Sequence, residues 1–227
     1  MQLHHATLEF LRAIKEHNSR KYFASIRPLY DEIRENMQEV AASILDQLAK
    51  IDSDFTDIKP KDCLFRIYRD ARRLKDGDPI YKENFGMVLR PGGKKSELPA
   101  FYFHIQGSNQ SFFGGGLYWA NKEHLYNLRC YIRKHGDEYK KLVNSKSFKK
   151  YFGSIQWKKS IRLPDWFNPY DPYLDIIMLK QHLIHPPLTD KELLSTDITE
   201  RCMERIRASK EWMDFLNTGC LTKPKDK

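Results

Sequence analysis

Apolar residues near the amino terminus recur every three or four positions, which is the spacing of one helix face. From Leu8 to Ile14 this spacing predicts a short helix with Thr7 as its N-cap. A second run, from Tyr30 to Leu48, keeps the spacing over a longer stretch without Gly or Pro. It predicts a long helix that ends before the turn-rich segment closed by Pro60.

The pattern then changes to an alternation of apolar and polar positions, which is typical of strands. Loops of turn residues separate the alternating segments. Short loops join antiparallel neighbours, whereas parallel strands need longer crossovers, so we expect an antiparallel meander. Its four expected strands are residues 64–70, 84–90, 100–106 and 111–119.

Helical spacing returns after the expected sheet. Asn121 is placed to cap a helix whose buried face would hold Leu125, Leu128 and Ile132, with Cys130 beside them. A basic, helix-rich stretch follows this helix. We therefore expect the second half of the chain to be mainly helical.

The last part of the chain begins with an irregular segment. Prolines at 164, 169 and 172 alternate with aromatic residues, which predicts a loop held by packing. Two helices are expected to follow, one over residues 175–183 and one from Ser195 or Asp197 through Leu216, stopped at Gly219.

Together these elements predict an α+β fold in which a four-stranded antiparallel sheet is covered by helices from both ends of the chain. No repeat and no linker separates two domains in the sequence. We expect a single domain over residues 1–220 and a frayed tail over residues 221–227.

The formal net charge of +9 favours contact with phosphate or another anion, although many basic proteins bind nothing acidic. No window reaches the roughly 18 apolar residues that span a bilayer. The first residues lack the pattern of a signal peptide, so we expect a soluble, cytoplasmic protein with no membrane partner. The four cysteines lie far apart, which predicts neither a disulfide framework nor a zinc ribbon, and no motif indicates a metal or cofactor.

One short segment, FRIYRDARRLKDGDPIYKENFG, concentrates reactive side chains. On an alternating strand, Arg66, Tyr68 and Asp70 would share one face, about 7 Å apart in succession. Arg offers a planar fork for phosphate or carboxylate, Tyr donates a hydrogen bond, and Asp orients Arg or accepts a proton. The segment therefore predicts either a pocket for a small anion or a structural ion-pair network around Asp70.

Two further features lie in the expected sheet. His104 shares a strand face with Tyr102, where an imidazole would serve either in proton transfer or in an ordinary hydrogen bond. Gly114, Gly115 and Gly116 interrupt the last expected strand. They predict either a backbone nest for an anion or a bulge that bends the sheet.

These motifs, followed in order by FYFHI, FFGGGLYWANKEHLYNLRCYI and LPDWFNPYDPYLDIIMLK, resemble the family known as domain of unknown function 2461. The resemblance covers most of the chain. Its most specific part is the Arg-Ile-Tyr-Arg-Asp strand with the downstream Lys-Asp and Tyr-Lys pairs. The resemblance implies a fold without an assigned reaction, and the family motif has hydroxyl residues where this chain has Ala71 and Leu74.

We expect the protein to bind a small anionic or phosphorylated ligand. A nucleic-acid-binding module is an alternative, because residues 146–162 mix basic and aromatic side chains, although these also fit a solvated face. A scaffold without a small ligand is a third hypothesis. Whether the protein is an enzyme stays open; a catalytic version would use His104 or Asp70 as the proton carrier. The expected ligand-binding residues are Arg66, Tyr68, Arg69, Arg72, Lys75, Tyr81, Lys82, Gly114, Gly115 and Gly116.

Overall fold

The computed structural model describes residues 2–118, 120–153, 155, 159, 160, 162 and 167–224. The chain divides into two compact units. The expectation of a single domain stays a prediction. Unit 1 comprises Met1–Lys94, Tyr102–Phe113 and Pro187–Glu204, and unit 2 comprises Lys95–Phe101, Gly114–Pro186 and Arg205–Lys227. Strands β2 (Ala100–Ile105) and β3 (Ser111–Leu117) and helix α9 (Ile198–Leu221) each contribute residues to both units.

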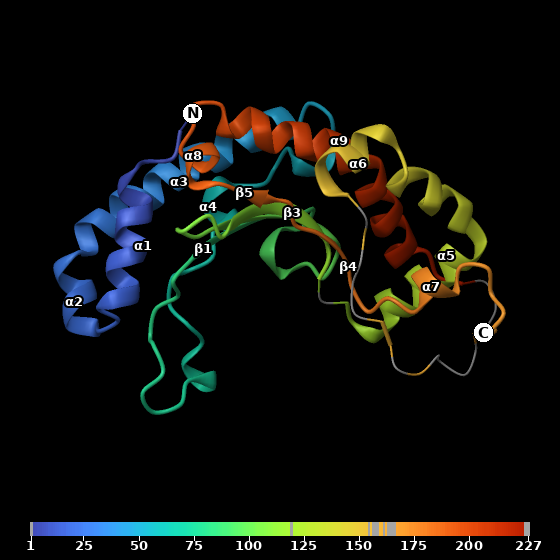
Figure 1. Ribbon diagram of the computed structural model, residues 1–227, viewed down its shortest axis with the longest axis horizontal. Coiled ribbons are helices and arrows are strands. Elements are labelled where there is room, and N and C mark those ends of the chain that lie inside the picture. Colours follow the sequence, from blue (N-terminus) through green and yellow to red (C-terminus); the bar gives the residue numbers. More distant parts are fainter. Residues whose placement is uncertain are drawn as a thin grey trace. The chain divides into compact units, whose positions relative to one another are not determined.

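Two amphipathic helices form much of the core of unit 1. They are α1 (Ala6–Glu16) and α3 (Arg27–Leu48), drawn in blue in Figure 1. Both bury the apolar face that the periodicity predicted. The prediction that Thr7 caps α1 was wrong, because the helix begins at Ala6 and Thr7 is fully buried within it. The other elements of this unit are α2 (Arg20–Ser25), α4 (Pro60–Cys63), β1 (Phe85–Leu89), β5 (Pro187–Leu188), α8 (Asp190–Leu193) and two short 3₁₀ turns, Ser53–Phe55 and Ala71–Arg73.

Aromatic side chains connect these helices to the first strand. The ring of Phe10 stacks on Phe85 with centroids 5.7 Å apart, and Tyr30 lies 6.2 Å from the same Phe85 ring. Phe23 of α2 contacts both Phe10 and Tyr30. Since rings of this size bury a large apolar area, this cluster fixes α1, α2 and α3 on the strand that leads into the candidate site.

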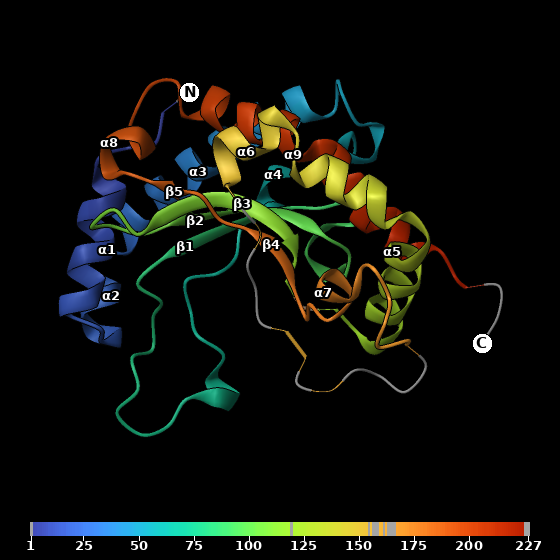
Figure 2. The ribbon, with the colours of Figure 1, turned by 45° about the vertical axis from the view of Figure 1, so that its right-hand side comes forward.

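The sheet is an antiparallel meander, as predicted, and its strand order is β1-β2-β3-β4, where β4 is His182–Ile184 (Figure 2). Strand β5 pairs with the first residues of β3. Strands β2 and β3 are joined by a turn in which Ser108 and Asn109 have φ angles of 62° and 57°. Two left-handed central residues give the tight hairpin whose twist matches that of the strands.

The prediction of a strand over residues 64–70 was wrong. This segment makes only isolated bridges, at Leu64 and Tyr68. The alternation would have placed Phe65 on the packed face together with Ile67, but Phe65 is 39% exposed whereas Leu64 and Ile67 are buried. Burial therefore recurs after three residues rather than two, which no regular strand allows, and the fourth strand of the meander is β4 instead.

Unit 2 is mainly helical. Its long helix α5 (Lys122–Val143) is capped by the Asn121 side chain, which accepts a hydrogen bond from the backbone N–H of His124, as predicted. Leu128 and Ile132 are fully buried on the predicted face, while Leu125 is half-buried. Two shorter helices, α6 (Lys146–Phe152) and α7 (Leu174–Ile177), belong to the same unit.

The two expected terminal helices differ from the structure. The helix predicted over residues 175–183 ends at Ile177, and the chain enters β4 five residues later. Helix α9 does not stop at Gly219 but continues to Leu221. A Cβ at Gly219 would lie 2.6 Å from the Leu128 side chain, so this glycine permits close helix packing and is not a helix stop. Within the predicted proline-rich loop, residues 163–166 lie outside the described residues.

No helix within the described ranges is long and apolar enough to cross a membrane. The four cysteines are free thiols. Among the residues that the structure describes, no three His, Cys, Asp or Glu side chains gather in a way that would hold a metal ion.

Candidate anion-binding site

The basic segment FRIYRDARRLKDGDPIYKENFG, residues 65–86, belongs to unit 1 and forms most of an irregular ribbon with two legs (Figure 1). Its legs are residues 64–70 and 80–86. Backbone hydrogen bonds of 2.9 Å join them, from Phe65 N to Gly86 O, from Lys82 N to Ile67 O, and from Arg69 N to the carbonyl of residue 80. The ribbon thus fixes Arg66, Arg69 and Lys82 on neighbouring stretches of backbone, although it is not a regular strand pair.

Unit 1 holds the second leg of the ribbon at Tyr81. The Asn18 side chain donates to the Tyr81 carbonyl (3.0 Å) and accepts from its N–H (2.9 Å). The Tyr81 ring stacks on Phe23 at 4.3 Å, and Tyr68 contacts both rings, at 5.1 and 5.6 Å. Tyr68 and Tyr81 therefore belong to an aromatic cluster, and burial raises the pKa of the Tyr81 phenol.

Asp70 pairs with its near neighbour Arg72. The guanidinium donates from Nε to Oδ1 (3.0 Å) and from Nη2 to Oδ2 (2.7 Å), and the Arg72 backbone N–H also donates to Oδ1 (3.2 Å). These hydrogen bonds, chiefly that of the guanidinium, lower the pKa of Asp70 to about 2. Asp70 is consequently a weak base whose oxygens already serve the 3₁₀ turn at Ala71–Arg73.

On the two legs of the ribbon, Arg66, Arg69 and Lys82 have no counter-charge among the residues that the structure describes. Lys82 is half-buried, and its ammonium donates to the Arg66 carbonyl (2.9 Å) and lies 5.8 Å from the Phe65 ring centroid. Burial lowers the pKa of Lys82 most, and the charges of Arg66 and Arg69 lower it further. Among the described residues, no carboxylate lies within 4.0 Å of these three cations.

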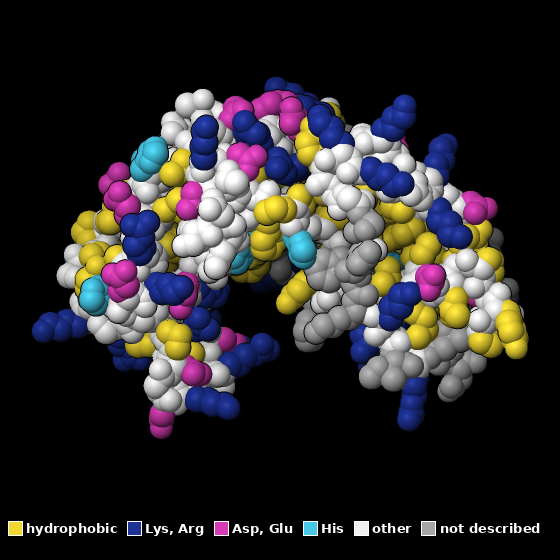
Figure 3. Space-filling view, viewed as in Figure 1, with side chains coloured by type: hydrophobic (Ala, Val, Ile, Leu, Met, Phe, Trp, Pro, Cys, Tyr) yellow, Lys and Arg dark blue, Asp and Glu magenta, His cyan; other side chains and the backbone are white. Residues whose placement is uncertain are grey.

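The outer part of the loop is exposed. Lys75 and Arg73 lie there, and the Lys75 backbone N–H donates to the Asp78 carboxylate (2.9 Å). Figure 3 shows Lys and Arg side chains on and beside this loop, together with Asp and Glu side chains. Residues 64–86 carry six Lys or Arg side chains and four Asp or Glu side chains, so the segment has a small excess of positive charge.

His104 lies on β2 in a polar setting of its own. Its ring stacks on Phe112 with centroids 4.9 Å apart and planes within 7°. Nδ1 lies 3.4 Å from the Asn84 amide nitrogen, and Nε2 lies 2.8 Å from the Gln106 amide oxygen. Burial lowers the pKa of His104, and the hydrogen bond to Gln106 opposes this in part. A neutral imidazole with its proton on Nε2 satisfies both contacts.

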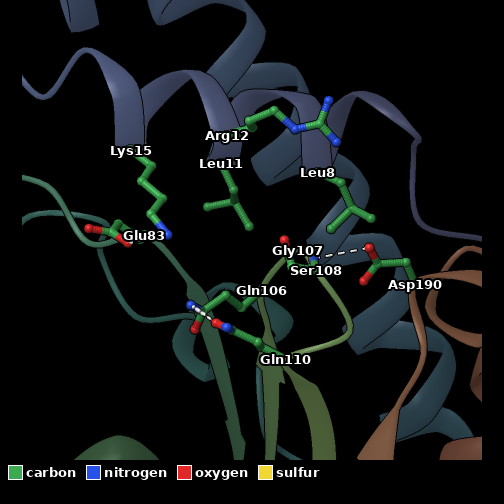
Figure 4. Close-up of a pocket in the computed structure, with 10 residues that line it drawn as sticks. All are labelled: Leu8, Leu11, Arg12, Lys15, Glu83, Gln106, Gly107, Ser108, Gln110 and Asp190. Carbon is green, nitrogen blue, oxygen red and sulfur yellow. Dashed lines mark hydrogen bonds and ion pairs between the residues drawn. The ribbon is translucent and has the colours of Figure 1, made fainter.

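The hydrogen bond to Gln106 leads from His104 to a depression that the sequence did not indicate (Figure 4). Helix α1 forms one wall, with Arg12 and Lys15, and the β2–β3 turn forms the other. The depression holds about 460 Å³ of space, including solvent at its mouth. Lys15 pairs with Glu83 across it at 3.7 Å, and Asp190 accepts hydrogen bonds from the N–H groups of the turn. No motif could have found this depression, because it joins four separate segments of the chain.

The three glycines lie in unit 2, where they pack against backbone. A Cβ at Gly114 would lie 1.9 Å from the Ile184 carbonyl oxygen, and one at Gly116 would lie 1.9 Å from that of His182. Gly116 has a φ of 119°, which L side chains rarely adopt. These contacts give the glycines a role in strand pairing, and the anion nest stays a prediction.

The basic stretch over residues 146–162 is only partly described. Lys159 pairs with Asp175 at 2.7 Å, and the Lys150 ammonium donates to the Tyr151 hydroxyl at 3.1 Å. Phe148 packs on Trp212 in the core of unit 2. Residues 156–158, which include one of the predicted stacking aromatics, lie outside the described residues. The described part thus uses its aromatic and basic groups for internal contacts.

A comparison with protein-family models places residues 6–215 in the family described as conserved hypothetical protein (DUF2461). Because the match covers nearly the whole chain, the protein belongs to this family, as the motifs had predicted. No curated protein and no solved structure matches the chain.

Proposed function

We propose that unit 1 binds a small ligand bearing a phosphate or carboxylate group at Arg66, Arg69 and Lys82. The observation that carries the proposal is the proximity of these three cations without a carboxylate among the described residues. Two other cations of the same unit have one: Arg72 has Asp70, and Lys15 has Glu83.

The three cations are suited to bind an anion because they repel one another, and this repulsion is already present in the protein without a ligand. Charges of one sign destabilise each other, and the half-buried Lys82 ammonium has also lost hydration. An anion would relieve both effects and would accept the planar fork of an arginine in two parallel hydrogen bonds. The ribbon hydrogen bonds and the Asn18 contacts hold the backbone in place, so little ordering remains to oppose binding.

The more exposed residues of the loop have a secondary place in this proposal. Lys75 adds positive charge near the ligand, whereas Arg72 contributes only if it leaves Asp70. Tyr68 and Tyr81 position the ribbon. In a catalytic version, the neutral His104 is better suited to carry a proton than Asp70, whose two oxygens are occupied by Arg72.

Isothermal titration with inorganic phosphate and pyrophosphate at low ionic strength tests the proposal. The wild-type protein should bind pyrophosphate more tightly than phosphate, and Arg66→Ala or Lys82→Met should weaken binding about tenfold or more, because each removes a charge-assisted hydrogen bond. Arg73→Ala is the matched control, since it removes one positive charge from the same exposed loop. Equal losses in all three variants would show a diffuse charge effect and would reject a defined site.

A further inference from the structure

The depression beside helix α1 has no part in the function proposed above. All of the residues that line it belong to unit 1, and Arg66, Arg69 and Lys82 are not among them (Figure 4). Its volume of about 460 Å³ includes solvent at the mouth. Sites for small molecules hold roughly 300–1,000 Å³, so this one has room for a ligand of only a few heavy atoms.

Helix α1 provides a mixed wall for the depression. Its lining residues share one helix face because they are three or four positions apart, and they are Leu8, Leu11, Arg12 and Lys15. Leu8 and Leu11 extend toward the β2–β3 turn (Figure 4). Arg12 is exposed, and no hydrogen bond or ion pair joins it to another residue in the described ranges. The wall therefore places an apolar surface beside an unpaired guanidinium.

The two carboxylates that line the depression are already engaged. Glu83 pairs with Lys15 at 3.7 Å. Asp190 accepts one hydrogen bond on each oxygen, from the backbone N–H groups of Ser108 (3.0 Å) and Asn109 (2.9 Å). Its carboxylate thus holds the β2–β3 turn. Neither carboxylate forms an ion pair with the guanidinium on the α1 wall.

The amide side chains of the turn end in a hydrogen-bond donor. With the imidazole proton on Nε2, His104 donates to the Gln106 amide oxygen (2.8 Å). This contact orients the Gln106 amide, whose nitrogen donates to the Gln110 amide oxygen (Figure 4). The Gln110 amide nitrogen is left with N–H groups that have no acceptor in the part of the chain that the structure describes. A ligand can therefore use this nitrogen only as a donor.

We propose that the depression binds a short aliphatic carboxylate. The oxygens of the ligand accept hydrogen bonds from Arg12 and the Gln110 amide, and its hydrocarbon chain contacts Leu8 and Leu11. A guanidinium suits a carboxylate because its planar fork makes two parallel hydrogen bonds. The two cations and two carboxylates of the lining have no net charge, which favours a singly charged ligand over a multiply charged phosphate. This site is independent of the one proposed on the ribbon.

A titration of the wild-type protein with sodium butyrate at constant ionic strength, followed by proton–nitrogen-15 NMR, tests the site. The backbone amide of Gly107 and the side-chain amide of Gln110 should shift along a saturating curve, with a Kd on the order of 1 mM because the ligand is so small. Butyramide has the same carbon chain without the charge and should bind about tenfold more weakly or less well still. Acetate should also bind more weakly, since it lacks two methylene groups. Equal binding of butyrate and butyramide, or no saturable shift with butyrate, would overturn the proposal.

A pair of variants locates the carboxylate. Arg12→Met removes the guanidinium but keeps an apolar chain, and it should raise the Kd for butyrate about tenfold or more. Lys21→Met is the matched control, because it removes an exposed positive charge on α2, outside the lining of the depression. Its Kd for butyrate should equal that of the wild type. An unchanged Kd in Arg12→Met, or equal losses in both variants, would overturn the assignment.

The depression and the ribbon can be tested separately in the same spectra. Arg66→Ala, which should weaken pyrophosphate binding, should leave the butyrate shifts of Gly107 and Gln110 unchanged. Shifts that persist in this variant would support a separate carboxylate site, whether or not pyrophosphate binds to the ribbon. Loss of the butyrate shifts in Arg66→Ala would assign the carboxylate to the ribbon and would overturn the site in the depression.

Discussion

Acidification should destabilise the protein through His182. The side chain is fully buried, and its pKa is lowered to about 3 in the folded state, whereas an unfolded histidine titrates near 6.5. Below pH 6.5 the unfolded chain therefore binds a proton that the folded protein does not accept. The stability that the neutral imidazole contributes is fully present above pH 6.5 and is lost as the pH falls toward 3.

The magnitude follows from the two pKa values. At pH 5 the loss from this one residue is about 2 kcal/mol, and at pH 4 it is about 3 kcal/mol. Such losses are a substantial part of the stability of a typical protein of this size. His104 has a lowered pKa as well and contributes in the same direction, so a comparison of variants is needed to isolate His182.

Urea unfolding followed by circular dichroism at pH 7.5, 6 and 5, in chloride-free buffer, measures the effect. His182→Gln keeps an acceptor for the Tyr139 hydroxyl but cannot titrate, so its stability should fall less between pH 7.5 and 5 than that of the wild type, by about 2 kcal/mol. His5→Gln, at an exposed position, should behave like the wild type. An equal pH dependence in wild type and His182→Gln would refute the reasoning.

Three further predictions concern single residues. Gly116→Ala should lower the free energy of unfolding by about 2–4 kcal/mol, because the new Cβ would collide with a backbone carbonyl at an unfavourable φ. Gly107 has open space around it, so Gly107→Ala should change the free energy of unfolding little. Urea unfolding measures both variants. Asp70→Asn should leave Arg72 free and tighten pyrophosphate binding in a titration; weaker binding would show that the carboxylate supports the ligand. Asn18→Ala removes two hydrogen bonds to the ribbon and should cost about 1–2 kcal/mol, with faster proteolysis of the loop at residues 71–79; an unchanged cleavage rate would contradict this.

The sequence was sufficient for much of the fold because long periodic runs leave little choice of structure. The spacing from Tyr30 to Leu48 predicted α3, and three of the expected strands form β1, β2 and β3. The failures occurred where local pattern and tertiary packing compete. Residues 64–70 alternate in polarity, but their buried residues, Leu64 and Ile67, lie three positions apart. Gly219 looks like a helix stop but lies against Leu128.

The candidate site was only partly readable from the sequence. Arg66, Arg69 and Lys82 were predicted as ligand-binding residues because one short segment of the sequence contains all three. The structure places them on the two legs of one ribbon. The pairing of Asp70 with Arg72 depends on the direction of two side chains after a turn, which alternation does not specify. The buried contact between Tyr139 and His182 joins a helix to a strand 43 residues further along the chain, so no local pattern could indicate it.

The most direct test of the central claim is the pKa of Lys82, measured by nitrogen-15 NMR of the side-chain ammonium in free protein and with saturating pyrophosphate. The account predicts that this pKa lies below that of an ordinary lysine in the free protein and rises when the anion binds, because the ligand neutralises the repulsion from Arg66 and Arg69. An ordinary pKa that does not respond to pyrophosphate would contradict the proposed site.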